Sequence, residues 1–120
     1  MGREATRRRK AERRGRRAES LAVLYLRLKG YRILAMRFKC HAGEIDIIAR
    51  KGDLAIFVEV KARTSERVAI DAVTATAQRR IRAASDVWLS RQPDAHRLSQ
   101  RYDILAFLPR RLPRHFPDAF

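Results

Sequence analysis

Three charged side chains interrupt two otherwise apolar stretches near the middle of the sequence. Asp46 lies within residues 43–50, and Glu59 and Lys61 lie within residues 54–62. A converging Asp and Glu supply the hard oxygen ligands that a divalent cation such as Mg²⁺ prefers. A neighbouring lysine can stabilise the negative charge that develops on a phosphoryl group. These are the side chains needed to hydrolyse a phosphodiester with the help of a metal ion.

The two apolar stretches are predicted to pair as a β-hairpin. Residues 43–50 (GEIDIIAR) and 54–62 (LAIFVEVKA) are rich in β-branched and aromatic side chains, and the turn residues Gly52 and Asp53 lie between them. We expect the hairpin to close through a two- or four-residue loop about Lys51 and Gly52. A three-residue loop is the alternative that the same residues leave open.

The length of this loop decides whether the charged residues meet. Alternate residues of a strand share a face, so Glu59 and Lys61 lie together, and Asp46 shares its face with Glu44. A two- or four-residue loop places Asp46 opposite Phe57, with Glu59 as a diagonal neighbour within reach of a shared ion. A three-residue loop would separate Asp46 and Glu59 onto opposite faces. The alternative to a metal site is that these charged side chains face solvent on an edge hairpin, where they discourage pairing with strands of other chains.

The composition indicates a single basic domain. A chain of 120 residues with 46% hydrophobic content has enough apolar surface for one ordinary core. The 28 Lys and Arg residues outnumber the 13 Asp and Glu residues, and the net charge of +15 favours polyanions such as nucleic acid or an anionic membrane surface. The single Cys40 excludes an intramolecular disulfide, and the sequence contains no signal peptide or long apolar run. We therefore expect a cytoplasmic protein.

The first seventeen residues form a separate basic segment. They contain only two acidic residues, Glu4 and Glu12, against nine basic ones: Arg3, Arg7, Arg8, Arg9, Lys10, Arg13, Arg14, Arg16 and Arg17. Because residues 1–17 have few apolar side chains to bury, we expect them to form a mobile arm or a fraying helical extension. Residues 18–120 are predicted to form the single domain.

Other segments supply the remaining elements. Apolar residues from Ala18 to Leu28 follow helical spacing, and Gly30 lies where a C-terminal cap is expected. The other predicted elements are a strand at 31–38, a helix at 74–91 with Thr74 or Thr76 as N-cap, and a strand at 101–109. Beyond it, the prolines at 109, 113 and 117 are expected to interrupt regular structure.

The predicted order of elements is α-β-β-β-α-β. The third strand, the crossover helix and the fourth strand form a βαβ unit, whose right-handed connection makes the two strands parallel. The predicted fold is therefore α/β, with a mixed sheet flanked by helices. On the crossover helix, Arg79, Arg80 and Arg82 point away from the apolar stripe that contains Ile81 and Trp88.

Six sequence motifs resemble one protein family. They are GRRAE (15–19), GEIDIIAR (43–50), FVEVKAR (57–63), AQRRI (77–81), RYDILA (101–106) and RHFPDAF (114–120). Together they look like the YraN family, small bacterial proteins of uncharacterised role, and the resemblance covers nearly the whole chain from about residue 15. It implies a restriction-endonuclease-like (tRNA-endonuclease-like) core, similar to archaeal Holliday-junction resolvases and other PD-(D/E)xK nucleases.

The resemblance also implies roles for individual residues. Asp46 and Glu59 match the metal-binding carboxylates, and Lys61 matches the catalytic lysine. Glu19 matches an acidic residue of the first helix that joins the site in the resolvase branch. The alternative for Glu19 is a first-turn acid that is favoured by the helix dipole.

Three further polar residues lie near the predicted site or in the matched motifs. Gln78 corresponds to a polar residue near the phosphate, although Ala77 precedes it where family members commonly have a lysine. Glu44 could either reach the ion or anchor the hairpin. Asp103, within RYDILA, is expected to form structural hydrogen bonds.

The sequence thus predicts a Mg²⁺- or Mn²⁺-dependent endonuclease that acts on DNA, including branched DNA. Catalysis is assigned to Asp46, Glu59, Lys61 and Glu19, of which the three acids bind metal. The nucleic-acid backbone is expected to contact Arg16, Arg17, Gln78, Arg79, Arg80 and Arg82. A two-fold junction substrate would favour a homodimer. The alternatives are a noncatalytic DNA- or RNA-binding protein with the same fold and, with less support, a basic membrane-surface protein.

Overall fold

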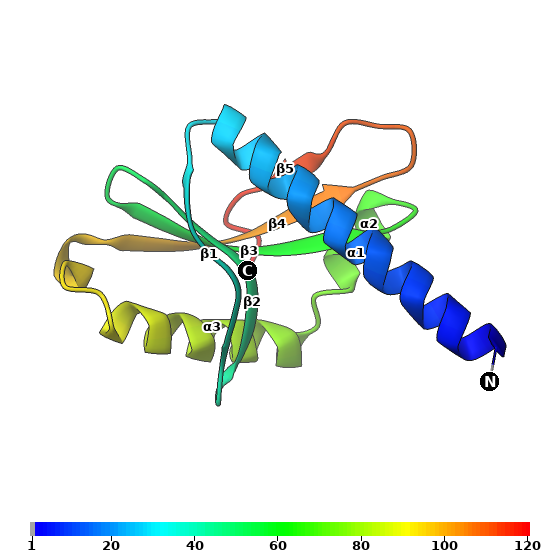
Figure 1. The fold of residues 1–120 in the computed structure, drawn as a ribbon. Helices are drawn as coiled ribbons and strands as arrows, with labels where there is room; N and C mark the ends of the chain where they lie inside the picture. The colour runs from blue at the N-terminus through cyan, green and yellow to red at the C-terminus, as the bar shows by residue number, and fades with distance from the viewer. Residues whose placement is uncertain (1) are drawn as a thin grey trace.

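The protein folds as helices packed on both faces of one five-stranded sheet (Figure 1). The computed structural model describes residues 2–120, so the Met1 end of the expected basic arm lies outside the described residues. The elements in chain order are α1 (Gly2–Leu28), β1 (Arg32–Cys40), β2 (Gly43–Lys51), β3 (Leu54–Ala62), α2 (Glu66–Asp71), α3 (Ala75–Ser90), the 3₁₀ helix η1 (Ala95–Arg97), β4 (Ser99–Phe107) and β5 (Arg114–Phe116).

The sheet is mixed, as the sequence predicts. Its strand order is β1-β2-β3-β4-β5, with β3 and β4 parallel and all other neighbouring pairs antiparallel. The parallel pair follows from the crossover through α2 and α3, which carries the chain from the end of β3 back to the opposite end of the sheet, so that β4 starts in the same direction as β3. The expected α/β architecture with a mixed sheet is confirmed.

Alternation along the central strands divides the core between the two helices. Ile47, Ile56 and Val58 pack in a buried cluster with residues of α1. Ile48 and Phe57, one position along, belong to the cluster that contains residues of α3. Figure 1 shows α1 on one side of the sheet and α3 on the other. Each large apolar side chain buried in this way contributes roughly 1.5–3 kcal/mol, so both helices are held firmly to the sheet.

Helix α1 is longer than the apolar spacing indicates. It begins at Gly2, so residues 2–17 continue the helix predicted from Ala18. The domain boundary after residue 17 stays a prediction. Arg, Lys, Glu and Ala dominate this part of the chain, and all are good helix formers. The predicted C-terminal cap is confirmed: Gly30 has φ 91°, and its N–H donates to the carbonyl of Arg27.

The second half of the chain contains three short elements that were not predicted from the sequence: α2, η1 and β5. Helix α3 begins after Thr74, whose Oγ1 accepts a hydrogen bond from the Ala77 N–H at 3.1 Å, so Thr74 rather than Thr76 is the N-cap. The short helix α2 precedes it. Strand β5 lies between two of the prolines expected to prevent regular structure, because three residues suffice to pair with β4.

None of the helices that the structure describes has an apolar stretch long enough to cross a membrane.

Candidate active site

The hairpin of β2 and β3 closes one residue later than expected. Lys51 pairs with Leu54, so the loop consists of Gly52 and Asp53. Gly52 has φ 60°, the left-handed conformation that the first residue of a type II′ turn requires. A loop formed by Lys51 and Gly52 would impose an unfavourable conformation on a lysine, which explains the difference.

The register therefore differs by two residues from the predicted one. Phe57 lies opposite Ile48, so the expected pairing of Phe57 with Asp46 is wrong. The last pair of the ladder is Ile47 with Val58, and the next position brings Asp46 level with Glu59. Because an error of two residues preserves the face of each side chain, the predicted convergence of Asp46 and Glu59 survives it.

Asp46 lies at an irregularity in β2. Ile45 belongs to the cluster around α3 and Ile47 to the cluster around α1, so the normal alternation breaks between them. The corresponding residue of β1 is Arg37, which has φ 53°. Asp46 Oδ2 accepts a hydrogen bond of 2.8 Å from the N–H of Val60, which joins β2 to β3 beyond the last ladder pair.

Glu59 lies beside Asp46 in a largely buried position, with 13% of its side chain exposed. Burial, reinforced by the charge of Asp46 and a hydrogen bond with it, raises the pKa of Glu59 to about 8. Lys61 lowers that pKa in part, because its Nζ lies 3.5 Å from Glu59 Oε2. The structure thus brings together all three residues that the sequence predicts at the centre of the site.

Glu19 reaches the edge of this site from α1. It lines a cavity together with Asp46 and Lys61, but its Oε2 accepts a hydrogen bond of 2.7 Å from Arg37 Nε. Arg37 is not among the site residues predicted from the sequence. A left-handed arginine within a strand, paired with an acid from a distant helix, leaves no signal in local sequence.

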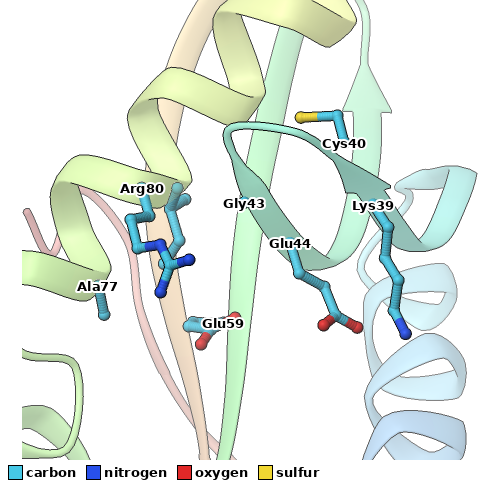
Figure 2. A pocket seen from close by; sticks show the side chains of 8 residues that line it. Lys39, Cys40, Gly43, Glu44, Glu59, Ala77 and Arg80 are labelled. Atoms are coloured by element: carbon cyan, nitrogen blue, oxygen red, sulfur yellow. The ribbon is translucent and has the colours of Figure 1, made fainter.

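Two cavities meet at the carboxylates. The α3-side cavity has a volume of about 440 Å³, and its lining includes Lys39, Glu44, Glu59 and Arg80. Figure 2 shows Glu44 and Glu59 pointing into the same opening, with Arg80 of α3 on one side and Lys39 on the other. Glu44 and Asp46 line different cavities, and the alternation of β2 breaks between Ile45 and Ile47.

The α1-side cavity is the larger, with a volume of about 720 Å³. Its lining includes Asp46 and Lys61 from the hairpin and Glu19 from α1. It also includes Thr64 in the segment after β3 and Val68 of α2. The hydrogen-bonded pair of Asp46 and Glu59 thus connects two cavities of different composition.

The six residues predicted to contact nucleic acid have different surroundings. Arg16 and Arg17 are exposed on α1. On α3, Arg79 donates to Thr76 Oγ1, and Arg80 lines the α3-side cavity with Glu59. Gln78 Nε2 donates to the carbonyl of Val73 at 3.1 Å, and the Arg82 guanidinium lies 4.5 Å from the centre of the Tyr102 ring. Arg80 is therefore the member of this set placed beside the carboxylates.

Sequence comparison identifies the family. Residues 18–107 match the family model described as "Uncharacterised protein family UPF0102". The chain belongs to this family. The matched range contains Glu19, Asp46, Glu59, Lys61 and Asp103.

Several UPF0102 proteins are similar to the chain over nearly its full length. A UPF0102 protein of Rhizobium etli is 70% identical over 112 residues, which cover 93% of this chain and 92% of the relative. A UPF0102 protein of Agrobacterium fabrum is 62% identical over 117 residues, covering 98% and 96%. One of Sinorhizobium fredii is 65% identical over 111 residues, covering 92% and 91%.

The acidic pair of this UPF0102 chain suits a hard divalent cation. Within residues 2–120, no group of three or more His, Cys, Asp or Glu side chains is arranged to hold a metal ion. Two carboxylates, however, are the protein ligands that Mg²⁺ commonly uses, since water and substrate phosphate complete its coordination. Burial and the neighbouring charge of Asp46 raise the pKa of Glu59, and a cation held between the two acids would offset the cost of its negative charge. Asp46 and Glu59 therefore fit a Mg²⁺ or Mn²⁺ ion.

Asp103 belongs to a separate structural network. Its buried carboxylate accepts two hydrogen bonds from Arg101, at 2.8 and 2.7 Å, one from His115 Nε2 at 2.8 Å and one from the Asp118 N–H at 3.0 Å. Burial alone would raise the pKa of Asp103, but these hydrogen bonds outweigh burial and lower it to about 2. Asp103 thus holds the C-terminal segment against β4, as the expected structural role requires.

Proposed function

We propose that this UPF0102 chain is a metal-dependent endonuclease that hydrolyses phosphodiester bonds in DNA, including branched DNA. The observation that carries the proposal is the meeting of Asp46, Glu59 and Lys61 at the end of the β2–β3 hairpin. The fold supports the proposal through α1, the strands β1 to β3, the crossover helix α3 and a β4 parallel to β3, which follow the order predicted for the restriction-endonuclease-like core.

Each residue has a distinct role in this proposal. Asp46 and Glu59 hold the cation, and Glu59 must release its proton to do so, so that metal affinity rises with pH. Mg²⁺ or Mn²⁺, when bound, would polarise a phosphoryl oxygen and activate water for attack. Lys61 stabilises the charge that develops on the phosphate, because its ammonium group lies beside the carboxylates. Glu19 positions Arg37 at the edge of the site through their hydrogen bond.

The basic surface supports a nucleic acid as the substrate. A net charge of +15 attracts a phosphate backbone, and the exposed arginines of α1 and α3 lie on elements that line the two cavities. Arg80 and Lys39 border the α3-side cavity next to Glu59, where they can contact phosphates that flank the scissile bond.

A noncatalytic nucleic-acid-binding protein is the second candidate. Two observations favour it: Glu19 is already engaged by Arg37, and the part of the chain that the structure describes contains no metal-binding group of three acids, histidines or cysteines. In this alternative the basic surface binds DNA or RNA, and removal of divalent ions leaves binding unchanged.

The deciding experiment measures cleavage and binding on the same substrates. Purified protein is incubated with four-way junction, flap, duplex and single-stranded DNA and with structured RNA, in the presence of Mg²⁺ or Mn²⁺. We expect cleavage of branched DNA that is lost in Asp46→Ala and Lys61→Ala, while circular dichroism shows intact folding. Asp86→Ala is the matched control, because Asp86 is exposed on α3. Tight binding without cleavage of any substrate would reject the enzyme in favour of the binding protein.

A further inference from the structure

The lining of the α1-side cavity combines two kinds of surface. Its charged part is the candidate active site, with Asp46 and Lys61. Its apolar part comes from other elements: Val68 of α2, and Leu108 and Pro109, which follow β4. Val68 is 45% exposed, so an apolar side chain is available to a ligand in the cavity. A volume of about 720 Å³ lies within the range of about 300–1,000 Å³ typical of sites for small organic ligands.

Gly15 forms the wall of this cavity on α1. A glycine within a helix lowers its stability relative to alanine, so its presence in the middle of α1 calls for a reason. Packing does not provide one, because a Cβ atom added to Gly15 would have no heavy atom within 4 Å outside its own helix and chain neighbours. Gly15 lines the cavity, however, and a side chain there would occupy space next to Ala18 and Glu19. The glycine thus keeps open a space that the protein itself does not fill.

We propose that the α1-side cavity binds an unstacked nucleobase of the strand whose scissile phosphate lies at Asp46, Glu59 and Lys61. This inference rests on the proposed function, which places the phosphate there. A nucleobase has apolar faces that suit the surface of Val68 and Pro109, and its attached phosphates suit Lys61 and Arg63, which line the same cavity. The cavity is large enough for a nucleotide but cannot admit a duplex.

A cavity that binds an unstacked base would select one class of substrate. A base that is paired and stacked within B-form DNA cannot enter the cavity unless the duplex opens. The preferred substrate is therefore a nucleic acid with an unpaired nucleotide next to the scissile bond, as at a branch, flap or bulge, and a continuous duplex is a poor substrate.

Binding of two duplexes that differ at one position tests this inference. One duplex carries a single unpaired 2-aminopurine, whose fluorescence depends on stacking, and the other carries the same base fully paired. Binding is measured with EDTA present, so that cleavage does not interfere. We expect binding to change the emission of the unpaired probe. Gly15→Leu should weaken affinity for that probe by about tenfold and change affinity for the paired duplex by less than about twofold.

Ser20→Leu is the matched control for Gly15→Leu. Ser20 is exposed on the same helix and does not line the cavity, so this leucine should leave both affinities unchanged. Because leucine is a better helix former than glycine, the melting temperature of Gly15→Leu should be no lower than that of the wild type. This measurement distinguishes a blocked cavity from a damaged fold. Equal loss of affinity for both probes, or an unchanged emission on binding, would overturn the inference.

Cleavage with Mg²⁺ separates this inference from the proposed function. If the wild type cleaves paired and unpaired duplexes equally well, the inference is wrong and the proposed function stands. A different result would reject the hydrolysis alone. If the wild type cleaves neither duplex, but binding still changes the emission of the unpaired probe and Gly15→Leu abolishes that change, the cavity binds the base and the proposed hydrolysis is wrong.

Discussion

Replacement of Glu59 by glutamine should stabilise the protein. Glutamine has nearly the same shape as glutamate and can donate a hydrogen bond to Asp46, but it carries no charge and takes up no proton. In the wild type, burial and the neighbouring Asp46 raise the pKa of Glu59 from 4.5 to about 8. Folding at neutral pH therefore requires either a buried negative charge or the uptake of a proton, and the variant avoids both.

The size of this stabilisation depends on pH. Because the folded-state pKa of Glu59 lies above the unfolded value, its effect on stability becomes less favourable as the pH rises from about 4.5 to about 8, and it then levels off. With about 1.4 kcal/mol per pH unit, Glu59→Gln should be more stable than the wild type by about 3 kcal/mol at pH 7 and by about 1 kcal/mol at pH 5. For a domain of this size, the difference of about 3 kcal/mol at pH 7 corresponds to a rise in Tm of roughly 10 °C.

Urea denaturation in EDTA provides the measurement. Trp88 reports unfolding, because it is the single tryptophan and is only 7% exposed. Glu44→Gln is the matched control, since Glu44 lines the same cavity as Glu59 but is exposed and should change stability little. A raised pKa of Glu59 is excluded if Glu59→Gln is no more stable than the wild type at pH 7, or if its advantage does not decrease between pH 7 and pH 5.

Three further predictions concern other parts of the molecule. Asp103→Asn should lower the free energy of unfolding in urea by about 3 kcal/mol at pH 7, because it leaves Arg101 without its buried counterion. The difference between variant and wild type should shrink as the pH falls from about 4 toward 2, where Asp103 takes up a proton. A difference that does not depend on pH would contradict the lowered pKa of Asp103. Gly30→Ala should lower stability by about 1 kcal/mol in the same measurement, because Gly30 has φ 91°, and an unchanged midpoint would reject the cap. Arg80→Ala should reduce the slope of log affinity against log salt concentration by about one in DNA-binding titrations, and an unchanged slope would exclude a phosphate contact.

Local patterns in the sequence predict the elements of the fold well. Gly30 after an apolar helical stripe predicts the end of α1, and Thr74 is one of two N-caps that the sequence offers for α3. The parallel pairing of β3 and β4 follows from their order along the chain, because a crossover helix separates them. These features depend on residues close in sequence or on general rules of connection, so they can be derived without coordinates.

The details of the site depend on less local effects. The hairpin register is an exception, because the local rule against a lysine at the first position of a two-residue loop already favours a loop of Gly52 and Asp53. The break in alternation at Asp46 coincides with the left-handed Arg37 on the neighbouring strand. The hydrogen bond between Arg37 and Glu19 joins residues 18 positions apart on different elements. Sequence patterns therefore identify the acids and the lysine of the site but do not predict which cavity each residue lines.

Cleavage of a four-way DNA junction by the wild type and by Asp46→Asn is the direct test of metal-dependent hydrolysis at this site. Both proteins are assayed over a range of Mn²⁺ and Mg²⁺ concentrations, with junction binding measured in parallel. We expect metal-dependent cleavage by the wild type, a loss of at least about 100-fold in Asp46→Asn, and junction affinity that is retained in the variant. Equal cleavage by the two proteins, or no cleavage by the wild type despite tight binding, would contradict metal-dependent hydrolysis at this site.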